Sequence, residues 1–255
     1  MADGSALTGR AALGARLISL LALLALWEAV ARALGDPHLP AASRVFAMLW
    51  TETRSGVLPF NLAVTLARVA ASFTLAMVLG TLLGLAMGRW RRLDLLLDSA
   101  LIALLNVPAL VVIVLLYIWF GLNEISAVAA VAINKLPATA VTIREGARAV
   151  DRGLLEMAAS FHIGRGRTLR HIVLPQLAPY LFAAARSGLS LIWKIVLVVE
   201  LLGRSNGVGF EIQIAFQLFD VTRILAYTLA FIIVVQLIEW GLLQPFERHV
   251  ARWRR

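Results

Sequence analysis

Residues 66–87 read LARVAASFTLAMVLGTLLGLAM, with Arg68 as the single charged side chain. A bilayer core about 30 Å thick is crossed by roughly 20 mostly apolar helical residues. The stretch is therefore long and apolar enough to cross a membrane as one helix. It predicts an integral membrane protein.

The whole chain has the same character. Of its 255 residues, 60% are apolar and 15% are charged, whereas a soluble globular domain has about 45–50% and about 25%. Cysteine is absent, which excludes disulfides, thiolate metal sites and iron–sulfur clusters. In a membrane protein, arginines retained on the cytoplasmic side explain the net charge of +9, and nucleic-acid binding is not needed to explain it.

Six stretches of this kind predict an all-α, polytopic fold. The predicted spans cover residues 17–34, 66–87, 99–120, 125–143, 177–202 and 224–246. We expect one transmembrane domain over residues 1–255, with a cytoplasmic connection at residues 144–176. Among arginines outside the spans, only Arg44, Arg54, Arg204 and Arg223 fall on one side of the membrane. Because short cytoplasmic segments retain basic residues, the other side, with both termini, is predicted to be cytoplasmic.

The sequence has no motif for a reaction of its own. It lacks the G-x-x-x-x-G-K-[ST] pattern that holds nucleotide phosphates, and it lacks the G-x-S-x-G turn of a serine nucleophile. No two of its histidines have the i, i+4 spacing of metal ligands on one helix face. We expect no catalytic residue, no metal and no cofactor in this chain. The functional classes that these absences do not exclude are transporters, channels and membrane scaffolds.

The long connection, residues 144–176, reads REGARAVDRGLLEMAASFHIGRGRTLRHIVLPQ. Asp151 is placed to cap a helix that begins at the next residue. Gly164 and Gly166 predict a break after that helix, and a second short helix is expected over residues 167–173. Pro175 is expected to end the second helix, because proline disfavours helical geometry in the residue before it. The connection is predicted to form a helix-turn-helix knob with Leu155, Ala158, Ile172 and Leu174 among arginines.

This connection resembles the cytoplasmic loop of ABC importer permease subunits, the inner-membrane components of binding-protein-dependent transport systems. Their signature is E-A-A, three residues, G, nine residues and I-x-L-P. The matching residues are Glu156, Ala158, Ile172, Leu174 and Pro175. Met157 stands in place of the first alanine. His162 stands in place of the glycine, with Gly164 two residues later.

The likeness extends along most of the chain. Trp119-Phe120-Gly121 ends the third span, Val199 to Gly203 read VELLG at the end of the fifth, and residues 207–210 read GVGF. In these details the chain is similar to the nitrate, taurine and alkanesulfonate permease branch.

The resemblance implies a type I importer permease in the bacterial inner membrane, itself non-catalytic. It implies that the loop docks on a dimeric ATPase, which binds ATP and Mg, and moves the helices beside it. A second permease subunit, first of all the same chain, and a periplasmic or lipid-anchored binding protein complete the assembly. The implied solute is a small anion such as a sulfonate, taurine or nitrate, although related permeases carry neutral or cationic metabolites. The alternatives are a loop that only fixes topology, and a secondary transporter or channel that needs no ATPase.

Small residues recur every four positions along the second span. They are Ser72, Ala76, Gly80, Gly84 and Gly88. Such a stripe permits close helix approach, within or between subunits, or it lines the pathway. Asn106 beside Pro108, and Asn134 beside Pro137, mark either pathway positions or kinks that are satisfied internally.

Five cations lie within or at the edges of the spans: Arg32, Arg68, Lys135, Arg186 and Lys194. Of these, Lys135, Arg186 and Lys194 are the costly ones. A cation at the centre of a span costs about 2.5–3.5 kcal/mol on insertion scales, so something must compensate. Either a carboxylate such as Glu200 or Glu239 pairs with them, or Arg186 reaches an interface, or they face a central pathway and attract an anionic solute. Glu28 and Arg32, one turn apart, are expected to pair.

Overall fold

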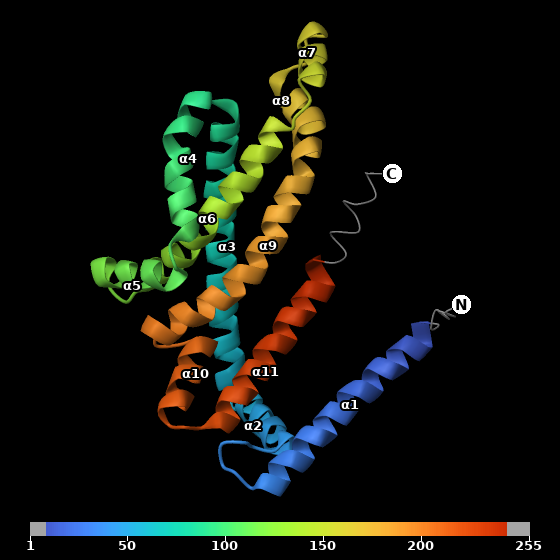
Figure 1. Ribbon diagram of the computed structural model, residues 1–255, viewed down its shortest axis with the longest axis vertical. Helices are drawn as coiled ribbons and strands as arrows, with labels where there is room; N and C mark the ends of the chain where they lie inside the picture. Colours follow the sequence, from blue (N-terminus) through green and yellow to red (C-terminus); the bar gives the residue numbers. More distant parts are fainter. Residues whose placement is uncertain (1–8, 244–255) are drawn as a thin grey trace. The chain divides into compact units, whose positions relative to one another are not determined.

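The computed structural model describes residues 9–243, which form a series of helices joined by short turns (Figure 1). The helices are α1 (Gly9–Leu34), α2 (Ala42–Arg54), α3 (Val57–Arg89), α4 (Arg91–Asn106), α5 (Ala109–Phe120), α6 (Glu124–Arg148), α7 (Arg152–Ser160), α8 (Arg165–Thr168), α9 (Leu174–Gly203), α10 (Val208–Gln217) and α11 (Val221–Ile238), with π-helical turns η1 (Leu169–Val173) and η2 (Glu239–Leu243). The chain divides into two compact units. The first holds residues up to Pro59 with Ile212–Ala230, and the second holds Phe60–Glu211 with the residues from Phe231 onward.

In the first unit, α1 and α2 are joined by polar contacts around one carboxylate. Glu28 accepts hydrogen bonds from the backbone N and the Oγ of Ser43, at 3.0 and 2.8 Å. Its Oε1 also lies 2.6 Å from Arg32 Nη2, which confirms the expected pair. On the other side of the turn, Trp27 Nε1 donates to the carbonyl of Pro40. The α1–α2 corner is therefore fixed by side chains from both helices.

The second unit is built around α6 and α9, which lie side by side, with α3 against α6 (Figure 1). The small-residue stripe makes the close approach of α3. A Cβ added to Gly80 would lie 2.7 Å from Thr139 Cβ, and one added to Gly84 would lie 2.5 Å from the carbonyl oxygen of Ala140. Gly88 meets Ala147 in the same way, and Ser72 and Ala76 are buried. In this structure the stripe therefore contacts α6 of the same chain.

Ion pairs join the start of α4 to the end of α6. Arg144 contacts Asp94 at 3.1 Å and also pairs with Asp98, and Arg148 pairs with Asp94. Because two arginines share one carboxylate, the C-terminal turn of α6 is held to α4 at more than one point.

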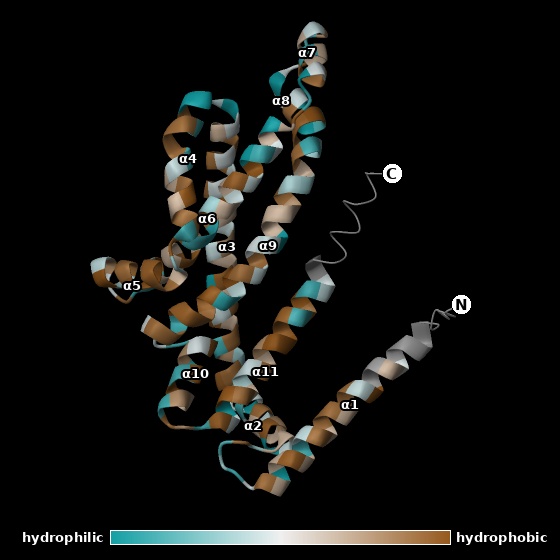
Figure 2. Cartoon of the chain, viewed as in Figure 1, coloured by the Kyte–Doolittle hydropathy of each residue, from teal (hydrophilic) through white to brown (hydrophobic). Residues whose placement is uncertain are grey.

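Apolar residues cover much of the surface of the long helices (Figure 2). Within the described residues, four helices are long and apolar enough to cross a membrane: Val57–Arg89, Glu124–Arg148, Arg165–Gly203 and Val221–Gly241. They contain or overlap four of the predicted spans. The broken pair α4 and α5 makes a fifth if it is one span. The predicted span 17–34 lies in α1, which is not among these, and residues 244–246 of the last predicted span lie outside the described residues. Six spans and cytoplasmic termini stay predictions.

The third predicted span, 99–120, is not one continuous helix. The chain leaves α4 at Asn106, and α5 begins at Ala109 with a bend of 99° between the two axes. Pro108 explains the break, because it has no N–H to donate and it favours extended geometry in the residue before it. Val107 adopts that geometry, with φ −70° and ψ 125°.

Candidate functional site

The first helix of the long loop is closed at both ends by local hydrogen bonds. At its start, Asp151 Oδ1 accepts from the backbone N of Gly153 at 2.7 Å, which confirms the predicted cap. At its end, the N–H groups of His162 and Ile163 donate to the carbonyls of Ala159 and Ala158, at 3.0 and 2.8 Å. This pair of bonds is the Schellman arrangement, which places the residue after the C-cap in the left-handed region.

His162 occupies that left-handed position, with φ +52°. It is also the position at which the signature has glycine, the residue that adopts positive φ without steric strain. The replacement of glycine by histidine therefore leaves the turn in the conformation that glycine favours. The histidine therefore adds strain of about 1 kcal/mol to the turn, and the backbone of the turn keeps its conformation.

The second half of the loop differs from its prediction at Pro175. A helix was expected to end there, but α8, η1 and α9 follow one another without a break, so that Arg165–Gly203 is one long helix. Pro175 lies in the first turn of α9, directly after the π-helical turn. A proline is tolerated at such a position because the wider turn changes the hydrogen-bond pattern and its missing N–H leaves no helical bond unmade.

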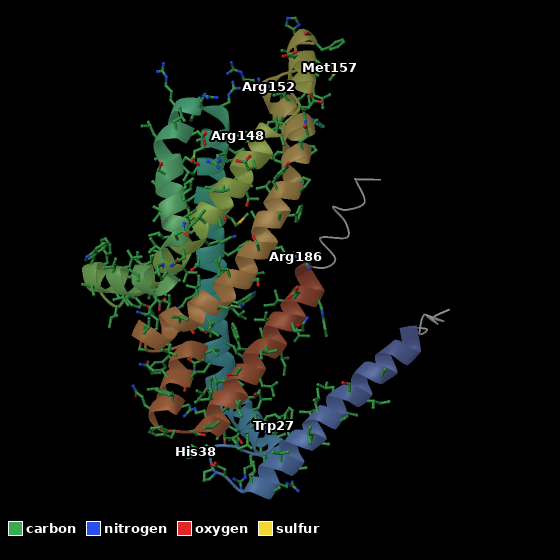
Figure 3. All side chains as sticks on the ribbon, in the orientation of Figure 1. Trp27, His38, Arg148, Arg152, Met157 and Arg186 are labelled. Carbon is green, nitrogen blue, oxygen red and sulfur yellow. The ribbon has the colours of Figure 1, made fainter. Side chains whose placement is uncertain are left out.

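One face of α7 presents apolar side chains to solvent. Leu154, Met157 and Phe161 follow the i, i+3, i+7 spacing of a single helix face, and all three are exposed, Phe161 to 76%. Figure 3 labels Met157 near the end of the molecule at which α7 lies. The signature drew attention to Glu156, which is exposed, and to Ala158, which is buried and faces inward. The exposed triplet was missed, although its spacing was readable in the sequence.

Of the other signature positions, Leu174 and Pro175 are exposed and Ile172 is half-buried. Gln176 bridges the two halves of the loop: its Oε1 accepts from the backbone N of Asp151 at 2.9 Å, and its Nε2 donates to the Ile172 carbonyl at 3.0 Å. Beneath α7, a cavity of about 730 Å³ is lined by the last turns of α3 and α6, by Leu155 and Glu156, and by the start of α9. The knob is thus tied to α9 and stands away from α3.

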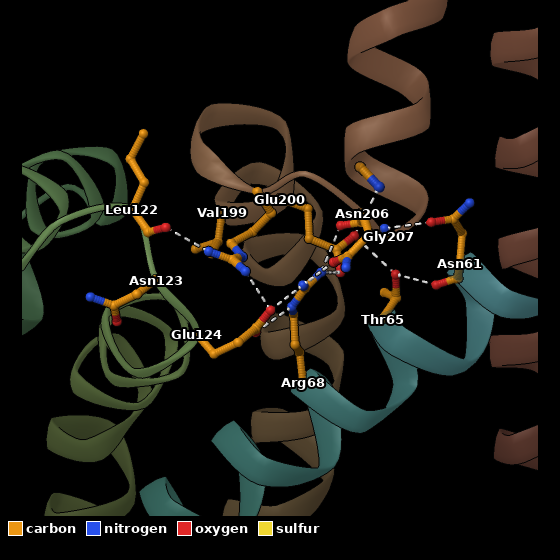
Figure 4. A network of polar contacts seen from close by, with 12 residues as sticks. Asn61, Thr65, Arg68, Leu122, Asn123, Glu124, Val199, Glu200, Asn206 and Gly207 are labelled. Atoms are coloured by element: carbon orange, nitrogen blue, oxygen red, sulfur yellow. Dashed lines mark hydrogen bonds and ion pairs between the residues drawn. The ribbon is translucent and has the colours of Figure 1, made fainter.

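At the other end of α9, Arg68 is the centre of a polar network (Figure 4). Its Nε and Nη2 donate to the two carboxylate oxygens of Glu124, at 2.9 and 2.6 Å, and its Nη1 donates to Glu200 at 2.7 Å. The backbone carbonyl and the side-chain oxygen of Asn206 accept the remaining two N–H groups. All five donors of the guanidinium are therefore used.

Glu200 is completely buried, with 0% exposure, and Arg68 is 4% exposed. Besides Arg68, the Glu200 carboxylate accepts from Thr65 Oγ1 and from the backbone N of Gly209, both at 2.9 Å. Gly209 lies in the first turn of α10, where a carboxylate is also favoured by the helix dipole. Removing one partner of such a buried pair costs about 3–5 kcal/mol, because the other charge is left unpaired.

The turn between α9 and α10 follows the same network. Asn61 Oδ1 accepts from the backbone N of Gly207 at 2.7 Å, and Thr65 Oγ1 accepts from the backbone N of Val208 at 2.9 Å. Gly207 has φ +105°, and a Cβ there would overlap the Glu200 carboxyl group. The VELLG and GVGF segments are therefore structural partners, and the network joins α3, α6, α9 and α10.

This network corrects one expectation about the intramembrane cations. Glu200, a candidate partner for Lys135, Arg186 or Lys194, is engaged by Arg68 instead. The sequence signal for that pair was available: Arg68 and Glu200 are both charges inside predicted spans. Their separation of 132 residues gave no local reason to join them.

The three cations have different surroundings. Lys135 is 2% exposed, and its Nζ donates to Ser187 Oγ at 3.2 Å. Arg186 and Lys194 are exposed on α9. The two asparagines are bonded within their own helices: Asn106 Nδ2 donates to the Ile102 carbonyl at 2.7 Å and Asn134 Nδ2 to the Ala130 carbonyl at 2.8 Å. Both side-chain amides are therefore bonded within their own helices, and the choice between a pathway position and a kink stays a prediction.

Within residues 9–243, no group of three or more His, Cys, Asp or Glu side chains is placed to hold a metal ion. The described residues form an all-helical membrane chain with an exposed, capped helix between two candidate spans, an arrangement that fits a subunit of a membrane transporter.

Comparison with known proteins agrees with this class. Residues 76–240 match the family described as binding-protein-dependent transport system inner membrane component. A putative aliphatic sulfonates transport permease of Bacillus subtilis is 30% identical over 200 residues, which cover 78% of this chain and 72% of that protein. The taurine transport system permease of Escherichia coli is 26% identical over 92% of this chain and 88% of its own length.

Among solved structures, the MetNI methionine ABC transporter in an inward-facing conformation has a similar fold. Its TM-score is 0.64 at 18% identity, with 78% of this chain and 98% of that chain covered. The chain belongs to the inner-membrane components of binding-protein-dependent transport systems. It is a multi-pass membrane protein and the permease subunit of an ABC importer, a class that works with an ATPase and a substrate-binding protein.

Proposed function

We propose that two copies of this chain form the translocation pathway of an importer in the bacterial inner membrane. The α7–α8 knob docks on a dimeric ATPase that binds ATP and Mg, and this chain is non-catalytic. The solute is a small anion such as a sulfonate, taurine or nitrate, delivered by a periplasmic or lipid-anchored binding protein. The names of the related permeases support the solute class. A single transmembrane domain with both termini in the cytoplasm remains part of this proposal.

One observation carries the coupling role: the exposed apolar face of α7 lies within a loop that has the signature spacing. Exposed apolar side chains at i, i+3 and i+7 are what helix-in-groove recognition requires. A loop that only fixed topology would need its arginines and would have no use for Leu154, Met157 and Phe161 in water. The surrounding charges, Glu156 among them, would orient the docked helix.

The test is co-purification with a candidate ATPase and a candidate binding protein taken from neighbouring genes, followed by ATPase and uptake assays in liposomes. Phe161→Asp and Met157→Asp are each expected to weaken ATPase binding by at least about 10-fold, because buried anchor residues dominate helix-in-groove affinity. Leu218→Asp, which changes an exposed leucine outside the loop, is the control, and the ATPase should bind this variant normally.

Two results would contradict the proposal. Normal ATPase binding and uptake in both α7 variants would mean that the knob is not the docking site. Solute entry into liposomes without a second polypeptide or nucleotide would favour the secondary transporter or channel. Chemical cross-linking of the purified chain would separately test the homodimer.

A further inference from the structure

The cavity beneath α7 has both apolar and cationic side chains in its lining. Its volume of about 730 Å³ lies within the range of about 300–1,000 Å³ that is usual for small-molecule sites. The apolar lining residues come from α3, α6, α7, α9 and the turns between them: Leu85, Ala147, Val150, Leu155, Val173 and Leu177. The charged ones are Arg89, Arg148, Arg152 and Glu156. Such a lining suits a ligand that is partly apolar and partly anionic.

The cavity lies at the end of a membrane-crossing helix. Helix α3 exposes the apolar side chains of Leu75, Leu79 and Leu82, which suit lipid, and its next turns supply Leu85 and Arg89 to the cavity. Directly after them, residues 89–92 read RWRR, and Trp90 is 62% exposed. Tryptophan and arginine at the end of a span are typical of the membrane–water interface. The cavity is therefore at the depth of the lipid headgroups.

The three arginines of the lining differ in their partners. Arg148 is engaged, because it pairs with Asp94 and contacts Glu145 at 3.3 Å. Arg89 and Arg152 are exposed, and neither makes an ion pair or a side-chain hydrogen bond with another residue in the described part of the chain. Figure 3 labels Arg148 and Arg152 near the end of the molecule that carries α7. Arg89 and Arg152 thus have all their guanidinium donors available to a ligand.

The carboxylate of the lining does not occupy these donors. Glu156 follows Arg152 by one helical turn on α7, yet within residues 9–243 the two side chains form no ion pair. Arg89 comes from the opposite wall, on α3. An acceptor that used both arginines would have to lie in the cavity between the two helices. A phosphate group meets this requirement, because its oxygens accept paired hydrogen bonds from guanidinium groups.

We propose that this cavity binds the headgroup of an anionic phospholipid from the leaflet on the side of the α7–α8 knob. Arg89 and Arg152 donate to the phosphate oxygens, and the apolar lining contacts the glycerol and the first acyl carbons. The rest of the acyl chains lie along the exposed apolar side of α3. Because the two arginines belong to α3 and α7, the bound lipid joins the knob to a helix from which it otherwise stands apart. The site belongs to this chain alone and does not depend on docking of the ATPase.

The test measures lipid binding to the full chain, purified in detergent and depleted of lipid. Native mass spectrometry compares the binding of phosphatidylglycerol and phosphatidylcholine with the same acyl chains. Arg89→Gln combined with Arg152→Gln removes the two proposed ligands. Arg91→Gln combined with Arg92→Gln is the matched control, since it removes two exposed arginines that do not line the cavity. All four arginines are exposed, so neither double variant should change the unfolding temperature.

The wild-type chain should bind the first phosphatidylglycerol at least about 10-fold more tightly than phosphatidylcholine, because basic residues beside an anionic headgroup each add several-fold affinity. The Arg89/Arg152 double variant should lose this preference, and the Arg91/Arg92 double variant should keep most of it. Phosphatidylglycerol should also slow amide hydrogen exchange in α7 and in the α3–α4 turn of the wild type, and it should not do so in the Arg89/Arg152 variant.

A soluble phosphate is the second possible source of the same chemistry. Inorganic phosphate and glycerol 3-phosphate are therefore added as competitors, and neither should displace phosphatidylglycerol, because they lack the acyl chains. Displacement by either one would overturn the lipid assignment and make the cavity a site for a soluble anion.

Three further results would overturn the inference. The first is equal affinity for the two lipids in the wild type. The second is a preference that survives the Arg89/Arg152 substitutions or is lost equally in the Arg91/Arg92 control. The third is loss of the preference when the ATPase is bound, which would mean that ATPase side chains fill the cavity.

Discussion

Two regions of the second unit carry charged residues inside the membrane-crossing helices, and the surroundings of those residues are opposite in the two regions. In the network at the end of α9, Arg68 and Glu200 are buried, and every donor of the guanidinium has an acceptor. In the middle of α9, Arg186 and Lys194 are exposed on the surface of a membrane-crossing helix. The comparison shows that charges inside the spans have two kinds of surroundings here: in the first region they are buried and paired with one another, and in the second they lie on the exposed side of a helix.

The largest expected effect separates the two regions by neutralising one charge in each. Glu200→Gln removes the buried one of the two carboxylates that pair with Arg68 and leaves only Glu124. It should lower the free energy of unfolding by about 3 kcal/mol, the low end for a broken buried pair. Lys194→Gln should change the free energy of unfolding by less than about 0.5 kcal/mol, because the Lys194 side chain is exposed and the substitution disturbs no packed contacts. Thermal unfolding in detergent, followed by tryptophan fluorescence, measures both. Similar losses in the two variants would break the comparison.

A double substitution asks whether the buried charges themselves stabilise the fold. Arg68→Met combined with Glu200→Met removes both charges, and it should recover about 2 kcal/mol of the loss seen in Glu200→Gln, since apolar replacements of buried pairs are often tolerated. Recovery will be incomplete because Glu124 and Asn206 also lose their partner. A double variant less stable than Glu200→Gln would show that the neighbouring contacts, rather than the pair, hold the network.

The two sides of α3 extend the comparison to packing. Gly84→Val would place carbon atoms against the Ala140 carbonyl and Ile143, and it should destabilise the chain by about 1–3 kcal/mol through overpacking. Leu82→Ala, on the exposed side of the same helix, should have a much smaller effect in detergent. A tolerated Gly84→Val would mean that α3 and α6 are free to separate. The same melting curves give the answer.

The smallest expected effect concerns the loop. His162→Gly should raise the stability of the α7 turn by up to about 1 kcal/mol, because glycine adopts the left-handed conformation without strain. Since the turn is local, we expect slower amide hydrogen exchange at Phe161 to Gly164 and little change in the global melting temperature. Faster exchange in the variant would show that the histidine side chain stabilises the turn.

The sequence predicted best what depends on long or strictly spaced patterns. Apolar length located the spans, and Asp151 located the start of α7, because both signals are local. Pro108 and Pro175 show the limit of local rules: one proline breaks a helix through Val107, and the other is accommodated after a π-helical turn. The Arg68 network was out of reach because its partners meet only after α3, α6 and α9 have packed. The sequence did not show that Arg186 and Lys194 both lie on the exposed side of α9, because only the folded structure shows which residues of a helix are exposed.

The unbroken helix from Arg165 to Gly203 has a mechanical consequence. It has 39 residues, and at 1.5 Å per residue it measures about 58 Å along its axis. The helix bends along its length (Figure 1), so a turn of about 10° around its midpoint displaces each end by at most about 5 Å, a typical scale for domain rearrangements. Its midpoint lies close to the Ser187 position, so the place that would move least is the place where Lys135 crosses from α6.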